Sequence, residues 1–342
     1  MPVDIIVGGQ GGDEGKGKIC AYLAYKDDYR YSIKIGGPNA GHTVFFKDRI
    51  YALKSIPAGF VNAKAKLLLG AGTYIITDWL IKEIADTRSQ DRVIIDPNAV
   101  IIEPRQMALE RGDERMMKSI GSVGTGLGAA VRERVERRKI RFAKDEPRLR
   151  RFIKDVPALL NRALEKGDKV LLEGTQGMKL SLLHGEYPFV TSRDTTASTF
   201  LAEAGLGPRY VRDVYAIFKP YVTRVGPGPL EKEIKDGSRL KVHHTRGREV
   251  GSVSGRLRRV GDFEERSAFR TVAINSATKV AITHIDIFPG NEGRKRIADF
   301  TPSAKNFLRK AERLSGIYPH PKLALVSYGP GLLDVIDLRR SR

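Results

Sequence analysis

The sequence has little sulfur and few aromatic side chains, and both scarcities exclude classes of protein. Its 342 residues include one cysteine, Cys20, so no disulfide can form within the chain. Aromatic residues make up 8% of the chain, and no recognisable motif of a nucleic-acid-binding fold is present. These features argue against a protein that binds RNA or DNA by stacking bases on aromatic rings.

Long apolar runs are also missing. No apolar stretch approaches the length of about 20 residues that spans a bilayer, and the first residues lack the basic and apolar regions of a secretion signal. Hydrophobic residues make up 41% and charged residues 29% of the chain, which is typical of a globular protein rather than a disordered one. We therefore expect a cytoplasmic protein that is not held by a membrane.

Negative charge is scarce relative to positive charge. The chain has 60 Lys and Arg against 40 Asp and Glu, which gives a formal net charge of +20. Such an excess is typical of nucleic-acid-binding proteins, but it also suits a site for small polyanions. The basic runs at 132–141 and 148–154 look helical and contain or adjoin acidic residues, so we expect most of their side chains to form solvated surface. Charge alone leaves both kinds of partner open.

Short apolar runs alternate with longer amphipathic ones along the chain. The apolar runs predict buried strands at 3–7, 32–35, 66–69, 92–95, 169–173, 213–218, 280–285 and 323–327. Helical spacing and plausible caps predict helices at 78–87, 104–118, 146–154, 157–166, 263–278 and 302–314. The alternation favours an α/β fold with a mainly parallel central sheet and helices on both of its faces.

No repeat, low-complexity tract or obvious linker interrupts this pattern. It predicts a single α/β domain over residues 1–342, with loop insertions at about 112–145 and 224–261. Both insertions are polar and contain glycine, so we expect them to include mobile loops over the site.

The strand predicted at residues 3–7 runs into the glycine-rich stretch GGQGGDEGKGK. Glycines at a turn between a strand and a helix allow backbone N–H groups to converge on an anion, and lysines add positive charge. Here Gly12, Gly17 and Lys18 have the spacing of a nucleotide-binding P-loop. Ile19, however, stands where a Ser or Thr hydroxyl should meet Mg²⁺, which argues against an ordinary P-loop.

Two carboxylates, Asp13 and Glu14, lie inside this phosphate loop. They are unexpected in a site that only holds anions, because they repel them. Metal ligation, proton abstraction or both would account for them.

A second glycine-rich segment, Gly37-Pro38-Asn39-Ala40-Gly41-His42-Thr43, follows the strand at 32–35. Together with GGDEGKGK, it resembles the adenylosuccinate synthetases, which join IMP and L-aspartate with hydrolysis of GTP. The resemblance implies a Mg²⁺-dependent homodimeric ligase of purine biosynthesis with no specific nucleic-acid partner. Relative to most members, the chain is shorter between residues 137 and 176 and between 259 and 327.

The resemblance assigns the chemistry to these two segments. It makes Asp13 the general base and, with the backbone carbonyl of Gly41, a ligand of Mg²⁺. Lys16 and His42 would stabilise the transferring phosphoryl group, with His42 as general acid. The other substrate-contacting residues implied here are Gly12, Glu14, Gly15, Gly17, Lys18, Asn39, Ala40 and Thr43, among which Asn39 would meet IMP.

Later strand-end segments are implied to hold IMP. In segment 121–128, Ser122 or Thr125 would contact its phosphate, because Val123 stands where the family has a threonine. Gln176 would act on the base and its phosphorylated intermediate. Thr191 is implied to contact the IMP phosphate. Arg137 would reach across a dimer interface to the IMP of the neighbouring subunit.

Two other parts of the chain complete the implied site. The aspartate-binding loop would comprise Ser252, Val253, Ser254, Gly255, Arg256 and Arg258, whose guanidinium groups suit carboxylates and phosphates. Guanine would be contacted by His284, Ile285 and Asp286 and by Ser327, Tyr328 and Gly329. Asp286 can accept hydrogen bonds from N1–H and the 2-amino group, while His284 replaces the usual lysine of the family.

Two other functions stay open at this point. A GTPase switch or a kinase for another substrate would share the phosphate loop, although Ile19 argues against the switch. Dependence of phosphate release on both IMP and aspartate would separate these enzymes. A basic nucleic-acid-binding protein would instead show an affinity for nucleic acid that falls steeply with salt.

Overall fold

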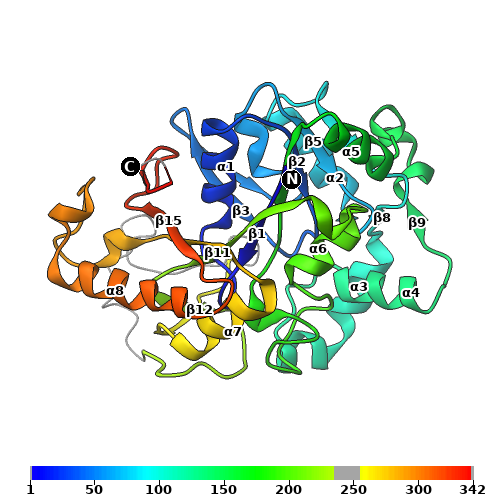
Figure 1. The fold of residues 1–342 in the computed structure, drawn as a ribbon. Coiled ribbons are helices and arrows are strands. Elements are labelled where there is room, and N and C mark those ends of the chain that lie inside the picture. The colour runs from blue at the N-terminus through cyan, green and yellow to red at the C-terminus, as the bar shows by residue number, and fades with distance from the viewer. Residues whose placement is uncertain (1, 235–254, 340–342) are drawn as a thin grey trace.

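The computed structural model describes residues 2–234 and 255–339, and the centre of this part is a nine-stranded sheet (Figure 1). Its strands are β1 (Val3–Gly8), β2 (Tyr29–Lys34), β5 (Lys66–Leu69), β7 (Val93–Ile95), β10 (Lys169–Glu173), β11 (Val211–Phe218), β14 (Lys279–Ile282), β15 (Lys322–Ser327) and β16 (Val335–Asp337). They lie in the order β16–β15–β14–β11–β1–β10–β2–β5–β7, with β1 in the middle. Neighbours pair in parallel except at the edge, where β16 is antiparallel to β15.

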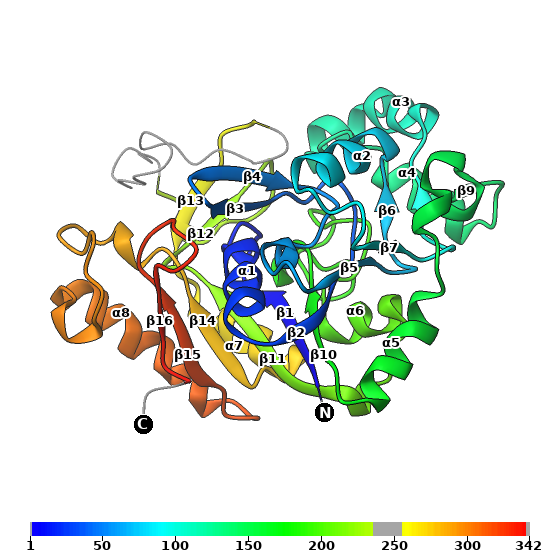
Figure 2. The same ribbon diagram turned by 90° about the horizontal axis from the view of Figure 1, so that it is seen from above.

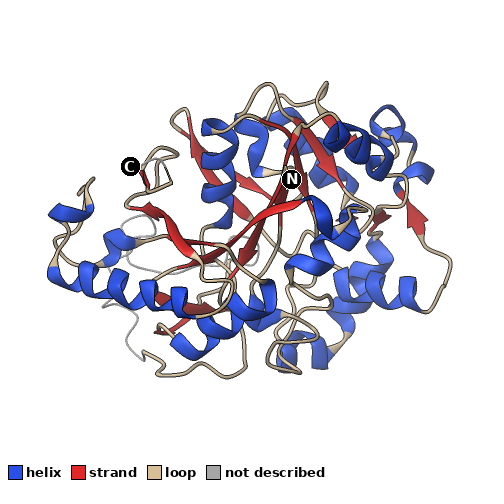
Figure 3. Ribbon diagram, viewed as in Figure 1, coloured by secondary structure: helices blue, strands red, loops and turns tan. Residues whose placement is uncertain are grey.

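Helices lie on both sides of this sheet (Figure 3). They are α1 (Lys16–Lys26), α2 (Thr77–Asp86), α3 (Pro104–Gly112), α4 (Leu127–Val135), α5 (Val156–Glu165), α6 (Ala197–Ala204), α7 (Glu265–Asn275) and α8 (Pro302–Glu312). In the described residues, none of them is long and apolar enough to cross a membrane. The α/β fold with a mainly parallel sheet, which the sequence predicts, is confirmed.

Alternation along β1 divides the core into two layers. Ile5 and Val7 belong to the apolar cluster that includes Phe200 of α6 and Val272 of α7. Ile6 belongs to the cluster on the other face, which includes Leu23 of α1. All of these side chains are buried, and side chains of successive strand residues point to opposite faces, so β1 is covered from both sides.

Smaller elements surround the sheet. A hairpin is formed by β3 (His42–Phe46) and β4 (Arg49–Leu53), and an antiparallel ribbon by β12 (Tyr221–Arg224) and β13 (Arg259–Asp262). A third small sheet contains β6 (Tyr74–Ile75), β8 (Val100–Ile101) and β9 (Arg141–Phe142). Figure 2 shows α8 and β16 near one end of the molecule and β9 at the other.

Several predicted elements change in the structure. The helix predicted at 104–118 ends at Gly112, and a π-helix, Arg115–Ile120, follows it. The helix predicted at 146–154 is a 3₁₀ segment, Pro147–Phe152, and the strand predicted at 280–285 stops at Ile282. Segment 112–145, which was predicted to include mobile loops, contains α4. The basic run at 132–141 looks helical in the sequence, but glycines 126 and 128 obscure the start of the helix.

Local signals do account for other helix starts. The Asp155 carboxylate accepts a hydrogen bond from the Ala158 backbone N–H at 2.8 Å and begins α5. The Thr301 hydroxyl accepts one from the Ala304 N–H at 3.4 Å and begins α8, whose first residue is Pro302. Such caps replace the missing intrahelical partners of the first turn.

Candidate active site

A cavity of about 640 Å³ lies at the carboxyl ends of β1, β10, β14 and β15. Open parallel sheets bind their ligands at this edge. The predicted site residues that line the cavity are Gly12, Asp13, Gly15, Lys16, Gly17, Lys18, Asn39, Ala40, Gly41, His42, Thr43, Ser122, Gln176, Thr191, Arg258, His284, Asp286, Ser327 and Gly329. Segments far apart in the sequence therefore meet at one place.

Other predicted site residues do not line the cavity. Those within the described ranges are Glu14, Thr125, Arg137, Gly255, Arg256, Ile285 and Tyr328. Ser252, Val253 and Ser254 lie outside the described residues. Arg137 is exposed, with φ +58°, just after the end of α4.

The buried carboxylate of Glu14 holds the backbone of the phosphate loop, the glycine-rich stretch at 8–18. The residue is fully buried, and its Oε1 accepts hydrogen bonds from the backbone N–H groups of Gln10 at 3.0 Å and Gly12 at 2.9 Å. Its Oε2 is 2.6 Å from the Lys16 Nζ. Burial alone would raise the pKa of Glu14, but Lys16 and the hydrogen-bond donors outweigh it and lower the pKa. Glu14 is therefore ionised, and its hydrogen bonds hold the backbone of the loop in place.

The phosphate loop is also fixed to the ends of two neighbouring strands. The Gln10 side-chain amide donates to the Lys219 carbonyl at 3.0 Å and accepts from the Lys219 N–H at 3.1 Å, just after β11. The Thr283 hydroxyl, just after β14, donates to the Glu14 carbonyl at 2.7 Å. Gly17 permits close packing, because a Cβ there would lie 2.8 Å from the Cβ of His42.

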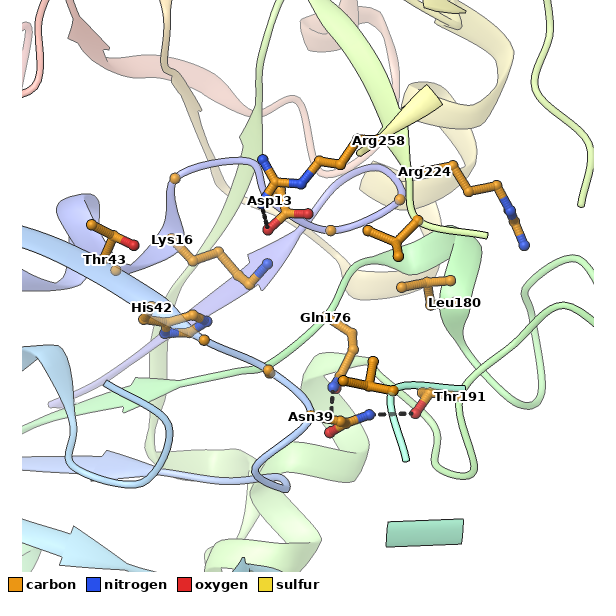
Figure 4. A pocket seen from close by; sticks show the side chains of 18 of the residues that line it. Asp13, Lys16, Asn39, His42, Thr43, Gln176, Leu180, Thr191, Arg224 and Arg258 are labelled. Atoms are coloured by element: carbon orange, nitrogen blue, oxygen red, sulfur yellow. Dashed lines mark hydrogen bonds and ion pairs between the residues drawn. The ribbon is translucent and has the colours of Figure 1, made fainter. Parts of the chain in front are cut away.

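Asp13 is the loop carboxylate that faces the cavity (Figure 4). Its backbone is left-handed, with φ +60°, and its side chain is 27% exposed. The Arg258 guanidinium lies 2.8 Å from its Oδ1. Burial raises the pKa of Asp13, although Arg258, Lys219 and Lys16 act in the opposite direction. A carboxyl group with a raised pKa on a cavity wall can act as a general base near neutral pH.

His42, the first residue of β3, is held by the buried Glu173 at the end of β10. Its Nδ1 hydrogen-bonds the Glu173 Oε1, and the Glu173 Oε2 accepts from the Ala58 N–H at 2.6 Å. The His42 Nε2 is buried and has no hydrogen-bond partner among the described residues. The arrangement orients the imidazole so that one nitrogen is bound to a carboxylate and the other is available for a ligand.

Burial and the charges around the imidazole set its protonation state. Burial, together with Lys34, lowers the pKa of His42 to about 4, even though Glu173 acts to raise it. The Lys34 ammonium lies 4.0 Å from the Glu173 carboxylate. His42 is therefore neutral near pH 7, with its proton on Nδ1 where Glu173 accepts it. Anions in the cavity favour the imidazolium form, because they oppose the effect of Lys34.

Polar side chains from three segments form a chain along another part of the wall (Figure 4). The Gln176 Nε2 donates to the Asn39 Oδ1 at 3.0 Å, and the Asn39 Nδ2 donates to the Thr191 hydroxyl at 3.4 Å. Gln176 has φ +57°, in the left-handed region. These three predicted residues are therefore brought together, and they supply donors and acceptors for a polar ligand.

In segment 121–128, the structure distinguishes the hydroxyls of Ser122 and Thr125, which the sequence leaves as alternatives. Ser122 lies on the wall, donates to Glu110 and accepts from the Gly124 N–H at 3.1 Å. The Thr125 hydroxyl is buried off the wall, and the described part of the chain provides it with no partner. Ser122 is therefore the hydroxyl that a ligand in the cavity can reach.

The described part of the arginine-rich loop bridges two walls. Arg256 donates to the carbonyls of Gly121 at 2.7 Å and Ser122 at 3.0 Å. Arg258, two residues later, reaches Asp13 on the phosphate loop. The two arginines therefore bring positive charge to segment 121–128 and to the phosphate loop, although only Arg258 lines the cavity.

Sequence reasoning missed several side chains of the site. Glu173, Glu110 and Arg224 were assigned no role, yet each lines the cavity or contacts a residue that does. Lys219, also assigned no role, holds Gln10 of the phosphate loop. Arg224 is buried and bonds the Glu186 carboxylate at 2.7 Å. One signal was available, because Glu173 and Arg224 are charged residues at the ends of apolar runs, and buried charges need partners.

The cavity contains ligands suitable for Mg²⁺. Within residues 2–234 and 255–339, no three His, Cys, Asp or Glu side chains form a cluster that could hold a metal by themselves. Mg²⁺ usually binds one or two carboxylates together with substrate phosphates. The Asp13 carboxylate and the backbone of Gly41, which both line the cavity, fit that mode.

Comparison with known proteins gives one consistent family. The family model described as adenylosuccinate synthetase matches residues 5–146 and 142–295. An adenylosuccinate synthetase of Archaeoglobus fulgidus is 41% identical over 344 residues, covering 100% of both chains. One from Methanocaldococcus jannaschii is also 41% identical, over 98% of this chain and 96% of that protein.

Solved structures share the fold. A fully ligated adenylosuccinate synthetase from Plasmodium falciparum superposes with a TM-score of 0.82 at 23% identity, covering 98% of this chain and 100% of that one. A succinoaminodeoxyadenylate synthetase from cyanophage S-2L, bound to dGMP and dATP as energy donor, gives 0.83 at 24% identity. That superposition covers 98% of this chain and 95% of the phage protein.

Proposed function

The chain belongs to the adenylosuccinate synthetase family, and from that premise we propose how its cavity performs the reaction. The enzyme is a ligase of purine nucleotide biosynthesis that joins IMP to L-aspartate in a GTP-dependent reaction. The observation that carries our assignment of roles is the placement of Asp13 and His42 on the wall of one cavity at the carboxyl ends of the strands.

The chemical difficulty is that the purine O6 is a poor leaving group. Asp13 removes the proton from N1 of IMP, which makes O6 nucleophilic toward the γ-phosphate of GTP. The resulting 6-phosphoryl group leaves as phosphate when the aspartate amine attacks C6, and the GTP is released as GDP. The raised pKa of Asp13 supports its role as base, because it brings the carboxylate closer in basicity to the purine N1.

Negative charge develops on the γ-phosphoryl group while it transfers. Lys16 and the backbone N–H groups of the phosphate loop offset this charge, as does His42 from its Nε2. The bound polyphosphate raises the pKa of His42, and the Glu173 carboxylate stabilises the imidazolium that results. Glu173 is a positioning residue in this account, since it acts through the imidazole.

Asp13 and the Gly41 carbonyl would hold Mg²⁺ together with phosphate oxygens of GTP. The ion would supply positive charge that screens the phosphates of the nucleotide. Asp13 would then have two tasks, which accounts for a carboxylate on the cavity side of a phosphate loop.

The remaining residues of the site would bind the other parts of the substrates. Gln176, Asn39 and Thr191 would hold the IMP base and phosphate, with Ser122 as a further phosphate donor. Arg258 and Arg256 would bind the aspartate carboxylates. Asp286 would select guanine, and this selection has to come from the site, since the phage protein of the same fold is bound to dATP as energy donor.

We place the enzyme in the cytoplasm as a homodimer in which Arg137 binds the IMP of the partner. Support for a role across an interface comes from its position, because Arg137 is exposed and off the wall of its own cavity. Mixing inactive Arg137→Ala with inactive Asp13→Asn would restore up to about a quarter of the activity, because some sites receive both intact residues. Two variants that never complement each other would contradict this role.

Phosphate release from GTP with Mg²⁺ tests the overall assignment, with IMP and aspartate each omitted in turn. Release only when both are present, with adenylosuccinate detected by its absorbance, is the expected result. Phosphate release that does not depend on IMP would instead support a GTPase or a kinase with another substrate.

A further inference from the structure

The Lys18 ammonium group points toward the turn that begins at the end of β15. Its Nζ donates to the Ser327 hydroxyl at 2.7 Å, to the Asp334 carbonyl at 3.0 Å and to the Gly329 carbonyl. A lysine ammonium has three N–H donors. These three protein acceptors therefore satisfy all of them.

The acceptors belong to one compact turn, residues 327–334, which begins at the last residue of β15 and ends just before β16. The Tyr328 N–H donates to the Asp334 carbonyl at 3.0 Å, and the Asp334 carboxylate accepts from the Gly331 N–H at 2.8 Å. Ser327 and Gly329 line the cavity. Lys18 itself is the third residue of α1, which continues directly from the phosphate loop.

The contact between Lys18 and turn 327–334 joins segments that follow two strands which are not neighbours in the sheet. In the strand order, β11 and β14 lie between β1, which leads into the phosphate loop, and β15, which leads into the turn. Asp286, which follows β14, also faces Lys18: burial lowers the pKa of Lys18 to about 8, while Asp334 and Asp286 act to raise it. Lys18 thus lies among the groups assigned to the guanine base.

We propose that Lys18 is a positioning residue for nucleotide recognition, whose ammonium group fixes turn 327–334 against the phosphate loop and so sets the shape of the guanine pocket. This inference rests on the proposed function, because that function assigns guanine to Asp286 and the turn. It departs from the expectation that Lys18 contacts the nucleotide phosphates, since a phosphate would have to displace three protein acceptors.

Two partial ligands distinguish the roles, namely guanosine, which lacks phosphates, and tripolyphosphate, which lacks the base. Each is measured as a competitive inhibitor against GTP in the complete reaction, for wild type and Lys18→Met. We expect the inhibition constant of guanosine and the KM for GTP to rise about tenfold or more in the variant, because charged hydrogen bonds are lost. The inhibition constant of tripolyphosphate and kcat should change less than about threefold, since phosphate contacts and chemistry remain.

Two variants serve as controls. Lys26→Met removes an exposed lysine from the last turn of the same helix and should leave all four constants unchanged. Asp286→Asn should weaken guanosine binding, which checks the base site independently. If wild type is not inhibited by guanosine or Asp286→Asn has no effect, the proposed guanine site fails rather than the role of Lys18.

A rise in the inhibition constant of tripolyphosphate with an unchanged constant for guanosine would overturn the inference, because Lys18 would then be a phosphate ligand. If Lys18→Met does not fold, as judged by thermal unfolding, Lys18→Arg replaces it. A planar guanidinium cannot satisfy three acceptors gathered around one ammonium, so guanosine should still bind more weakly. Unchanged guanosine inhibition in Lys18→Arg would count against the proposal.

Discussion

The two ends of the cavity are built in different ways. At one end, the phosphate loop follows β1 and is tied by Gln10 and Thr283 to the residues that follow β11 and β14. At the other end, the walls come from loops, and side chains such as Arg256 and Glu110 hold segment 121–128. Backbone carried by a central sheet positions groups more rigidly than loops do.

This difference matches the division of chemistry that we propose. The strand-borne end contains Asp13, Lys16 and His42, which act on the transferring phosphoryl group. The loop-borne end contains Ser122, which binds substrate and whose segment is held by Arg256. Changes at the first end should therefore act mainly on kcat, and changes at the second mainly on KM.

The largest effect is expected from Asp13→Asn. The amide keeps the shape of the side chain but cannot accept the N1 proton, so kcat should fall about 10²- to 10⁴-fold. The measurement is steady-state phosphate release with IMP, aspartate and GTP all present. Thermal unfolding should show an intact fold, and near-normal turnover would refute Asp13 as the base.

Glu173→Gln should give the next largest effect. The buried carboxylate that stabilises a protonated His42 is lost, and we expect kcat to fall about 100-fold because proton donation weakens. The matched control is Glu165→Gln, at the exposed end of α5. Saturation kinetics for each substrate decide the matter: a change confined to KM would mean that Glu173 only shapes a binding surface.

The pH profile gives a smaller and graded effect. Because burial raises the pKa of Asp13, its active carboxylate form is lost as the pH falls through a value above the ordinary one of about 3.9. We expect kcat/KM for IMP to fall about tenfold per pH unit on the acidic side of that pKa. Because Mg²⁺ held by Asp13 would lower this pKa, the profile is measured at limiting Mg²⁺, where an acidic limb at or below the ordinary aspartate pKa would contradict the assignment.

The smallest effect compares two hydroxyls at the loop-borne end. Ser122→Ala should raise the KM for IMP about threefold to tenfold, because one hydrogen bond to the phosphate is lost. Thr125→Val should leave this KM unchanged, since that hydroxyl is off the wall. A larger rise in KM for Thr125→Val than for Ser122→Ala would reverse our choice between them.

The sequence predicts the strand-borne end better than the loop-borne end. Strands 66–69 and 169–173 are found at the predicted residues, and the glycines after β1 mark a phosphate loop, because both signals are local. The start of helix α4 was hidden by glycines, and the helix predicted at 146–154 is a 3₁₀ segment that starts at Pro147.

Partners distant in the sequence could not be predicted from local patterns. His42 and Glu173 are 131 positions apart, and Lys18 is 316 positions from Asp334. Nor does a local pattern tell which of Asp13 and Glu14 faces the cavity, since the two are adjacent and each is next to one glycine. The fold decides these matters, because it sets which side chain the neighbouring strand can reach.

Positional isotope exchange in GTP tests the central claim most directly, because it detects phosphoryl transfer before aspartate takes part. GTP carrying a heavy oxygen in the bridge between the β- and γ-phosphates is incubated with enzyme, Mg²⁺ and IMP, without aspartate. Wild type should move the label to the non-bridging oxygens of the β-phosphate, while Asp13→Asn or omission of IMP should prevent it. A wild-type enzyme that forms adenylosuccinate but never exchanges the label without aspartate would contradict the account.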